Sequence, residues 1–414
     1  MDRSGLPIAG LAVFVAAMLG IPVDGVARAV DGNPDAEEAA LQSCPEFGTG
    51  FFRLPNSETC LKIGGQITVT GEANFGRKAL YAETLYLAGN PFIIYDLLPS
   101  EALPLKADTE TIISVTTAST TEYGPMVSFA SIKGNSTEQE TLGLEKAFMA
   151  IGGFTIGRRN SFFDFSTGLS FTGGYASNAI TTLVAYGRDV GAGGRVTVAL
   201  EDNKDRRVED GVWALRGSHT LPDVVVAARY DNENWGGVQL SAAITHLSDD
   251  RVTNCCGVPG DSYGWAIAAG AECRTKIAGY FGRFIFGTAY ADGALSYLGA
   301  FPFATDYIVD ADATLARTKG YSLLASYEHV WGERLKSTVT VSGISTRTRT
   351  RELLWAPSSI MATAGVEFMP ATGLTVGFEG NYYRDMATAQ YFGVQGESST
   401  ADFSKIKAYA RRTF

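Results

Sequence analysis

The chain has 414 residues, of which 45% are hydrophobic, 11% aromatic and only 19% charged, and its formal net charge is −10. This length suffices for one large domain or two ordinary ones. The acidic balance argues against a nucleic-acid partner, because phosphate binding needs a basic face. Histidine occurs only at His219, His246 and His329, which leaves little material for acid–base or metal chemistry.

The only long apolar run lies at the N-terminus, from Leu6 to Val23. Arg3 precedes the run, and Ala27-Arg28-Ala29 places small residues at the spacing that a signal peptidase requires. We therefore interpret residues 1–29 as a cleaved signal peptide. About 18 apolar residues also suffice for a spanning helix, which is the alternative, but no stop-transfer flank follows.

Two cysteines enclose a Gly- and Pro-containing loop over residues 45–59. This loop is short enough for a disulfide between Cys44 and Cys60, as expected in an oxidising compartment. A metal site is the alternative, but no C-x-x-C spacing or histidine partner supports it. We predict the disulfide in a short N-terminal segment over 30–60. The remaining cysteines, for which the pattern offers no role, are Cys255, Cys256 and Cys273.

From residue 61 to the C-terminus, apolar and polar residues alternate with a period of two. One example is 238–245, where Val238, Leu240 and Ile244 alternate with Gln239 and Ser241. Such alternation predicts strands with one apolar and one polar face. The polar face is mostly Thr, Ser, Gln and Gly with scattered charges, which is typical of a wet lumen inside a lipid-facing wall. Aromatic residues at strand ends suit an interfacial girdle: Trp265, Tyr327, Trp331 and Tyr382.

Short connectors alternate with long ones along this region, as in outer-membrane barrels. With residues 202–221 assigned to a long external loop, we count about 16 strands. We therefore predict an all-β fold, a transmembrane antiparallel β-barrel that occupies residues 61–414 as one domain. The chain ends on Phe414, and a final strand with a terminal aromatic residue is the usual end of such a barrel.

One stretch differs from the pattern expected of the barrel wall. A Gly152-Gly153 turn leads into a strand over 154–158, which is followed by a loop with three phenylalanines and one carboxylate: Phe162, Phe163, Asp164 and Phe165. Aromatic residues in a loop need a surface to pack against. We expect this loop to fold back into the barrel as a constriction. The alternative for Asp164 is that its carboxylate only caps a turn.

Short motifs occur in order along the mature chain. They are Phe47-Gly48-Thr49-Gly50-Phe51-Phe52, Thr59-Cys60-Leu61-Lys62-Ile63-Gly64-Gly65, Thr121-Glu122-Tyr123-Gly124, Gly153-Phe154-Thr155-Ile156-Gly157, Ser161-Phe162-Phe163-Asp164-Phe165, Tyr290-Ala291-Asp292-Gly293-Ala294-Leu295 and Arg412-Thr413-Phe414. Together they resemble the alphaproteobacterial general porins. The resemblance implies a homotrimer of outer-membrane barrels that passes ions and small hydrophilic solutes, with the third external loop in each lumen as the eyelet.

In such porins, acids on the loop face basic residues on the wall. By resemblance, Asp164 takes the acidic position, whereas the wall positions that carry arginine correspond here to Thr68, Ala118 and Val127. The charged residues that fall on the inward parity are Lys133, Lys146, Arg159, Arg195, Arg229, Glu72 and Glu110. With part of the basic row missing, the transverse field is weak. We expect weak charge selectivity with a mild preference for cations.

Three arginines, Arg347, Arg349 and Arg351, continue the outward parity of the strand before them. Cations are costly in lipid but not at the headgroup level, where these could bind lipopolysaccharide phosphates. The alternative is a solvated loop face. Small residues on outward positions, such as Ala362, Ala364 and Gly380, would allow barrels to approach closely.

Other chemistry is sparse, and no cofactor is expected. Asp306, Asp310 and Asp312 offer oxygen ligands suited to calcium, with a solvated loop as the alternative. A substrate-specific channel is the main rival function. A barrel enzyme or an adhesin is a further rival, but Ser218 beside His219 is the only near nucleophile–base pair, and adjacent residues seldom align for proton transfer.

Overall fold

The computed structural model describes residues 42–76, 79–87, 90–98, 105–136, 141–206, 221–248, 261–299, 304–310, 314–351, 353–391 and 397–414. The expected signal peptide over 1–29 lies outside these ranges, as do Ser218, His219, Cys255, Cys256 and Asp312. Within them, no helix is long and apolar enough to cross a membrane.

Sixteen antiparallel strands in the described ranges form one closed barrel, which confirms the predicted fold class and strand count. They are β2 (Cys60–Gly76), β5 (Lys106–Thr121), β6 (Gly124–Asn135), β7 (Thr141–Ile151), β8 (Phe154–Asn160), β9 (Ile180–Asp189), β10 (Gly194–Glu201), β11 (Asp223–Asn232), β12 (Gly236–Ser248), β13 (Asp261–Ile277), β14 (Tyr280–Asp292), β17 (Lys319–Val330), β18 (Leu335–Arg349), β19 (Leu353–Ala371), β20 (Leu374–Tyr391) and β21 (Glu397–Thr413).

The barrel closes where the first wall strand meets the last. β2 pairs with β5 on one side and with β21 on the other, in a register that sets Thr68 opposite Arg411. Beyond β21, Phe414 exchanges two backbone hydrogen bonds with Gly65, at 2.9 and 3.1 Å. The terminal residue is therefore part of the closure, which leaves no free sheet edge at this seam.

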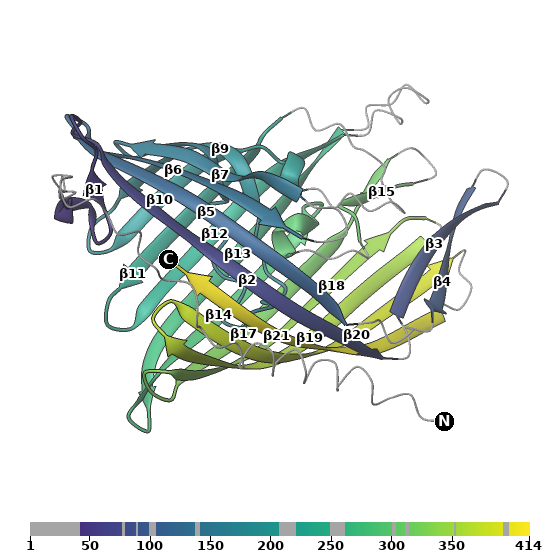
Figure 1. Cartoon of the computed structure of the whole chain (residues 1–414). Coiled ribbons are helices and arrows are strands. Elements are labelled where there is room, and N and C mark those ends of the chain that lie inside the picture. The colour runs from purple at the N-terminus through teal and green to yellow at the C-terminus, as the bar shows by residue number, and fades with distance from the viewer. Residues whose placement is uncertain are drawn as a thin grey trace.

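The connections at the two ends of the barrel differ in length. At the end that carries η1 (Pro45–Phe47) and β1 (Phe52–Arg53), turns are short, as at Gly152-Gly153 between β7 and β8. The hairpin of β3 (Ala79–Leu87) and β4 (Asn90–Leu98) and the pair β15 (Tyr307–Val309) and β16 (Leu315–Arg317) lie at the opposite end (Figure 1). Long connections there also contain η2 (Lys204–Arg206) and η3 (Leu295–Leu298).

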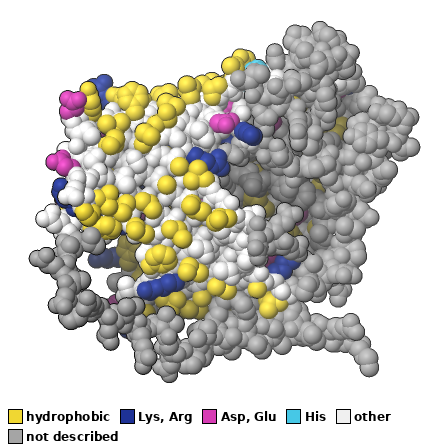
Figure 2. Space-filling view, turned by 45° about the horizontal axis from the view of Figure 1, so that its top comes forward, with side chains coloured by type: hydrophobic (Ala, Val, Ile, Leu, Met, Phe, Trp, Pro, Cys, Tyr) yellow, Lys and Arg dark blue, Asp and Glu magenta, His cyan; other side chains and the backbone are white. Residues whose placement is uncertain are grey.

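The alternation of apolar and polar residues corresponds to the two faces of the wall. On β12, Leu240 and Ile244 are 64% and 54% exposed on the outer surface, whereas Gln239, Ser241 and Ala243 are buried on the inner one. Figure 2 shows hydrophobic side chains spread over the barrel wall that it presents. An apolar exterior around a polar interior is the arrangement that lipid requires.

Aromatic side chains cluster near both ends of the outer face. Toward the short turns, His329 stacks edge-on against Trp331, with ring centroids 4.2 Å apart, and its Nδ1 lies 2.7 Å from the Tyr327 hydroxyl. Toward the other end, Trp265 packs against Tyr290, with ring centroids 5.4 Å apart. These positions suit the interfacial girdle expected for Trp265, Tyr327 and Trp331.

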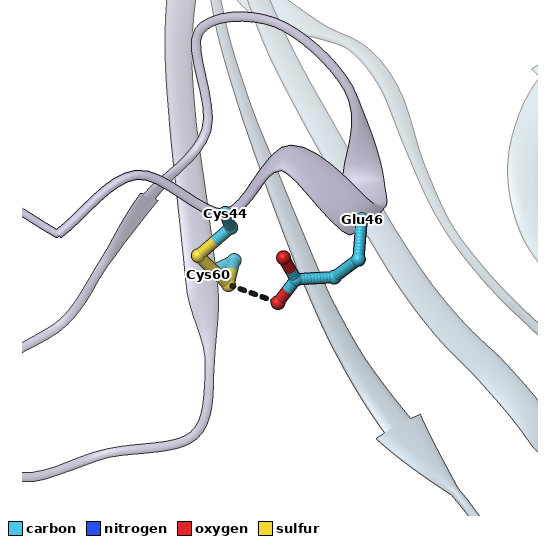
Figure 3. A group of neighbouring side chains, drawn as sticks. All are labelled: Cys44, Glu46 and Cys60. Atoms are coloured by element: carbon cyan, nitrogen blue, oxygen red, sulfur yellow. Dashed lines mark hydrogen bonds between the residues drawn. A yellow bond between two sulfur atoms is a disulfide. The ribbon is translucent and has the colours of Figure 1, made fainter.

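The predicted disulfide is present. Cys44 and Cys60 are joined with Cα atoms 6.2 Å apart, which fastens the N-terminal segment to the first residue of β2. Glu46 Oε1 lies 4.0 Å from Cys60 Sγ (Figure 3). A disulfide sulfur has no proton to donate and no thiolate to offer, so these three residues are not a metal site. Cys273 is the free cysteine of the described residues, and it is exposed.

We predict that the double variant Cys44→Ser, Cys60→Ser releases the N-terminal segment without opening the barrel. Closing a loop of this length contributes about 3 kcal/mol, so cleavage by protease within residues 42–60 should accelerate roughly hundredfold. Limited proteolysis followed by mass spectrometry measures this rate. Reductant should bring the wild type to the same rate, whereas Cys273→Ser should change nothing; equal rates for wild type and double variant would contradict the prediction.

Candidate pore constriction

The third long connection, residues 161–179 between β8 and β9, is called the constriction loop here. Apart from Asp164 it contains no charged residue, and Ser, Thr and Gly supply much of its sequence. Its hydrogen bonds reach inward-facing side chains of β12, β17, β18, β19 and β20. The loop therefore lies inside the barrel, as the sequence predicts.

The base of the loop packs on the wall of β12 and on η3. The Gln239 side-chain amide lies 3.2 Å from each of the carbonyl oxygens of Phe162, Phe163 and Asp164. Phe163 is 1% exposed, and its ring meets the edge of Tyr297 with centroids 4.6 Å apart. The aromatic residues of the motif thus supply a dry anchor from which the rest of the loop extends.

Asp164 ties the two ends of the loop together. Its carboxylate accepts hydrogen bonds from the Ser177 hydroxyl at 2.5 Å and from the Ala179 backbone at 2.7 Å, and Arg206 Nη2 lies 3.4 Å away. The side chain is only 10% exposed. This geometry corresponds to the turn-capping alternative more closely than to a free acid facing the pore.

Arg206, from η2 in the next long connection, holds this base in place. Its side chain is 2% exposed, and it pairs with Asp164 and with Glu201, whose Oε2 is 3.7 Å away. The guanidinium carbon lies 3.9 Å from the centre of the Tyr297 ring. Burial alone lowers the pKa of Arg206, but Tyr297, Asp164 and Glu201 raise it above its ordinary value overall. The base is therefore fastened by a buried cation.

At its far end the loop is held by a single carboxylate of β20. Glu379 accepts the backbone N–H of Phe171 at 2.7 Å and that of Thr172 at 3.1 Å, and the Thr172 hydroxyl also donates to it. Glu379 is 1% exposed. The Phe171 ring stacks on Tyr409 of β21 with centroids 4.0 Å apart. We call this contact the tip latch.

Between the base and the tip, hydroxyl groups of the wall form hydrogen bonds with the polar groups of the loop. Ser326 accepts the backbone N–H of Leu169 at 2.9 Å, and Ser342 accepts that of Tyr175 at 3.1 Å. The Tyr175 hydroxyl lies 2.7 Å from Ser359 Oγ, and burial raises the pKa of this tyrosine to about 12. The small polar residues on the inner face thus serve as hydrogen-bond partners for a loop that would otherwise bury unpaired backbone.

The predicted lumen charges divide into paired and unpaired groups. Three of the predicted cations are neutralised locally. Lys133 pairs with Glu110 at 2.6 Å, Arg195 with Asp189 at 2.8 Å, and Arg229 with Asp231 at 2.7 Å. Among the described residues, Lys146 and Arg159 have no carboxylate partner within ion-pair distance. The Arg159 guanidinium lies over the ring of Phe162, 4.5 Å from its centre. A cavity of about 440 Å³ beside the loop base brings Arg159, Arg195 and Arg229 to one space.

A basic row that the sequence analysis missed lies on β21. Lys405, Lys407 and Arg411 face inward, and Glu72 bridges the two lysines at 3.4 Å from each. Arg411 lies 5.2 Å from the centre of the Phe171 ring and has no described carboxylate partner. Their odd-numbered positions, which place all three on one face of the last strand, were the available signal for this row. Arg206 and Glu379 gave no comparable signal, because their partners are distant in sequence.

The other predicted sites lie away from the lumen or apart from one another. Arg347 and Arg349 project from the outer face of β18, and Arg351 follows it. Asp306 accepts the backbone N–H of Leu295 at 2.6 Å, whereas Asp310 accepts that of Arg351 at 3.1 Å. The described residues do not bring these two carboxylates into a group able to hold a metal ion, so the calcium interpretation gains no support.

Comparison with known proteins places this architecture. The model of the porin subfamily matches residues 34–409. Porin Omp2b of Brucella suis is 22% identical over 291 residues, which are 62% of this chain and 70% of that protein. Porin Omp2b of Brucella canis is 23% identical over 262 residues, which are 58% of this chain and 64% of that protein.

Solved structures show the same fold. The outer membrane channel DcaP of Acinetobacter baumannii superposes with a TM-score of 0.66 at 16% identity, over 87% of this chain and 98% of that one. Together with the closed barrel and its apolar exterior, these matches identify the chain as a member of the porin subfamily, an outer-membrane β-barrel channel protein rather than an enzyme.

Proposed function

We propose that the protein is a general diffusion porin, a water-filled channel for ions and small hydrophilic solutes whose narrowest section is set by the constriction loop. The observation that carries this proposal is the tip latch. A loop fastened at its base by Arg206 and Gln239 and at its tip by Glu379 spans the barrel interior and narrows it permanently. Such a filter selects first by size, because it is built from packed aromatic rings and neutral hydroxyl groups.

The electrostatic part of the proposal differs from the sequence expectation. A mild cation preference was expected from Asp164, Glu72 and Glu110, but each of these acids forms an ion pair. Near the loop, Arg159 and Arg411 are part-exposed cations that form no ion pair with a described residue. The carboxylates there without a described cation partner, Glu379 and Asp385, are buried and hydrogen-bonded to the loop or the wall. We therefore propose weak charge selectivity with a slight preference for anions, since unpaired charges dominate the field in a narrow passage.

We also propose the partners that the family resemblance implies, a homotrimer and lipopolysaccharide. On β19 and β20, outward positions Ala364 and Gly380 leave room for a second barrel, because a Cβ added at Gly380 meets nothing within 4 Å. Arg347, Arg349 and Arg351 supply the outward cations for lipid phosphates. Cross-linking in native membranes, resolved by denaturing electrophoresis, tests the trimer.

Replacing the latch carboxylate should widen the pore. In Glu379→Gln, one of the two acceptor oxygens becomes an amide donor that faces the Phe171 and Thr172 N–H groups, and losing hydrogen bonds to a charged group costs about 2 kcal/mol. We expect larger single-channel conductance, and liposome swelling with sugars that are too large for the wild type.

Glu328→Gln is the matched control for the latch variant. Glu328 also faces the lumen, from β17, but it pairs with Arg283 and Lys336 rather than with the loop. If both variants admit the same sugars as the wild type, the latch does not set the pore. Swelling by one favoured solute, without grading by size, would instead indicate a substrate-specific channel.

Charge selectivity is tested by the reversal potential across a salt gradient. We expect Arg411→Gln to shift the wild-type potential toward cations, because an unpaired lumen cation is removed. Arg412→Gln, on the next residue but on the outer face, should leave it unchanged. Asp164→Asn should shift it further toward anions, because this carboxylate lines the cavity of the three arginines and neutralises Arg206. A clear cation preference in the wild type would refute the proposed sign.

A further inference from the structure

The outer wall of the barrel carries a depression of about 1060 Å³ on β12 to β14 and β17 to β19. None of the constriction-loop residues line it, although the inner faces of the same strands contact that loop, so the depression opens to the outside. Its rim and floor are almost entirely apolar. Outward residues that line it include Leu240, Ala271, Phe286, Leu323, Gly343 and Ile360.

The depression ends at a pair of cations. Tyr321 and Ser345 line it and are register partners on β17 and β18. The next outward pair on the same two strands is Lys319 and Arg347, about 7 Å further along. Arg349 follows one step beyond on β18. On both strands, the last outward residue that lines the depression, called the groove below, is followed directly by an outward cation.

The protein balances these cations only in part. Lys319 is 60% exposed along its side chain and lies 3.5 Å from Asp292, a carboxylate that Arg317 already holds at 2.7 Å. Arg347 and Arg349 are exposed and form no ion pair with a described residue. Like charges directly opposite one another on neighbouring strands are destabilising, so an anion from outside the chain would stabilise the Lys319–Arg347 pair.

The position along the barrel fixes the kind of anion. Successive wall strands are antiparallel, so β8 and β18 run in the same direction. The β18–β19 connection therefore lies at the same end of the barrel as the constriction loop, which follows β8. In an outer-membrane barrel this end meets the headgroup level of the outer leaflet. An apolar groove that runs along the outer wall from a cationic cluster at that level toward the middle of the bilayer matches a lipid with phosphate at its head and acyl chains below.

We propose that the groove and the cations Lys319, Arg347 and Arg349 form one binding site for lipopolysaccharide. An acyl chain lies in the groove between Leu240 and Ile360, and a lipid A phosphate accepts charge-assisted hydrogen bonds from the cations. This proposal rests on the outer-membrane location of the proposed function but not on its pore. It extends the arginine contact to a composite site with separate head and tail contacts.

The test measures binding of purified lipid A to the detergent-solubilised protein by native mass spectrometry. In the double variant Arg347→Gln, Arg349→Gln, the loss of two cations near an anionic headgroup should weaken the binding of lipid A roughly thirtyfold. The loss should vanish with dephosphorylated lipid A. Arg412→Gln, at an outward arginine of β21 at the short-turn end of the barrel and away from the groove, should bind as the wild type does.

The groove has its own variant. A Cβ added at Gly343 meets Ser359 O at 3.5 Å and Ile360 Cγ1 at 3.9 Å, ordinary contact distances, so Gly343→Phe fits on the wall and fills the depression. It should weaken binding of both phosphorylated and dephosphorylated lipid A. Wild-type binding by both the arginine and the Gly343 variants would overturn the site. Channel conductance, recorded in parallel, should be unchanged in all variants; absent conductance with intact lipid binding would refute the pore and leave this site standing.

Discussion

Closure of the sheet is the constraint on which the rest of the structure depends. In lipid, every backbone N–H and C=O must be paired within the protein, and the seam between β2 and β21, extended by the Phe414–Gly65 hydrogen bonds, completes that pairing. A closed wall of alternating side chains then has an apolar outside and an enclosed polar inside. The apolar side chains that a soluble protein would bury are placed against lipid, so the interior is free to hold a loop and water.

The interior has its own constraint, which shapes the constriction loop. A loop folded into a narrow lumen loses water from its backbone, and each buried polar group then needs a partner. The wall supplies these partners as Ser326, Ser342 and Ser359, as the Gln239 amide and as the Glu379 carboxylate. The small polar residues of the inner face therefore make the pore hydrophilic and also position the loop. The loop is held along its length.

Much of the fold followed from periodicity and from other local sequence patterns. Strand faces, the barrel of 16 strands, the inward loop and the Cys44–Cys60 disulfide were all predicted, because each depends on residues close in sequence or on a repeated pattern. The contacts of the loop could not be predicted in the same way. Arg206 meets Asp164 from another connection, and Glu379 meets Phe171 across 208 positions. Parity shows that a residue faces inward, but not which partner it meets there.

Because parity does not identify the partner of a residue, the role predicted for Asp164 differs from its role in the structure. Sequence pattern places a carboxylate on the loop, yet the Arg206 guanidinium that neutralises it lies in a segment whose pattern is uninformative. The same holds for Glu72, which is paired by two lysines of the final strand. Lumen charge cannot be summed from composition, because the ion pairs decide which charges a solute meets.

The most direct test of the central claim is the single-channel conductance of a variant in which residues 166–175 are replaced by a Gly-Ser link that keeps Asp164, Ser177 and Ala179 in place. If the latched loop sets the narrowest section, this variant should conduct severalfold more current than the wild type in planar bilayers. An unchanged conductance in a correctly folded barrel would show that the pore is narrowed elsewhere and would contradict the account.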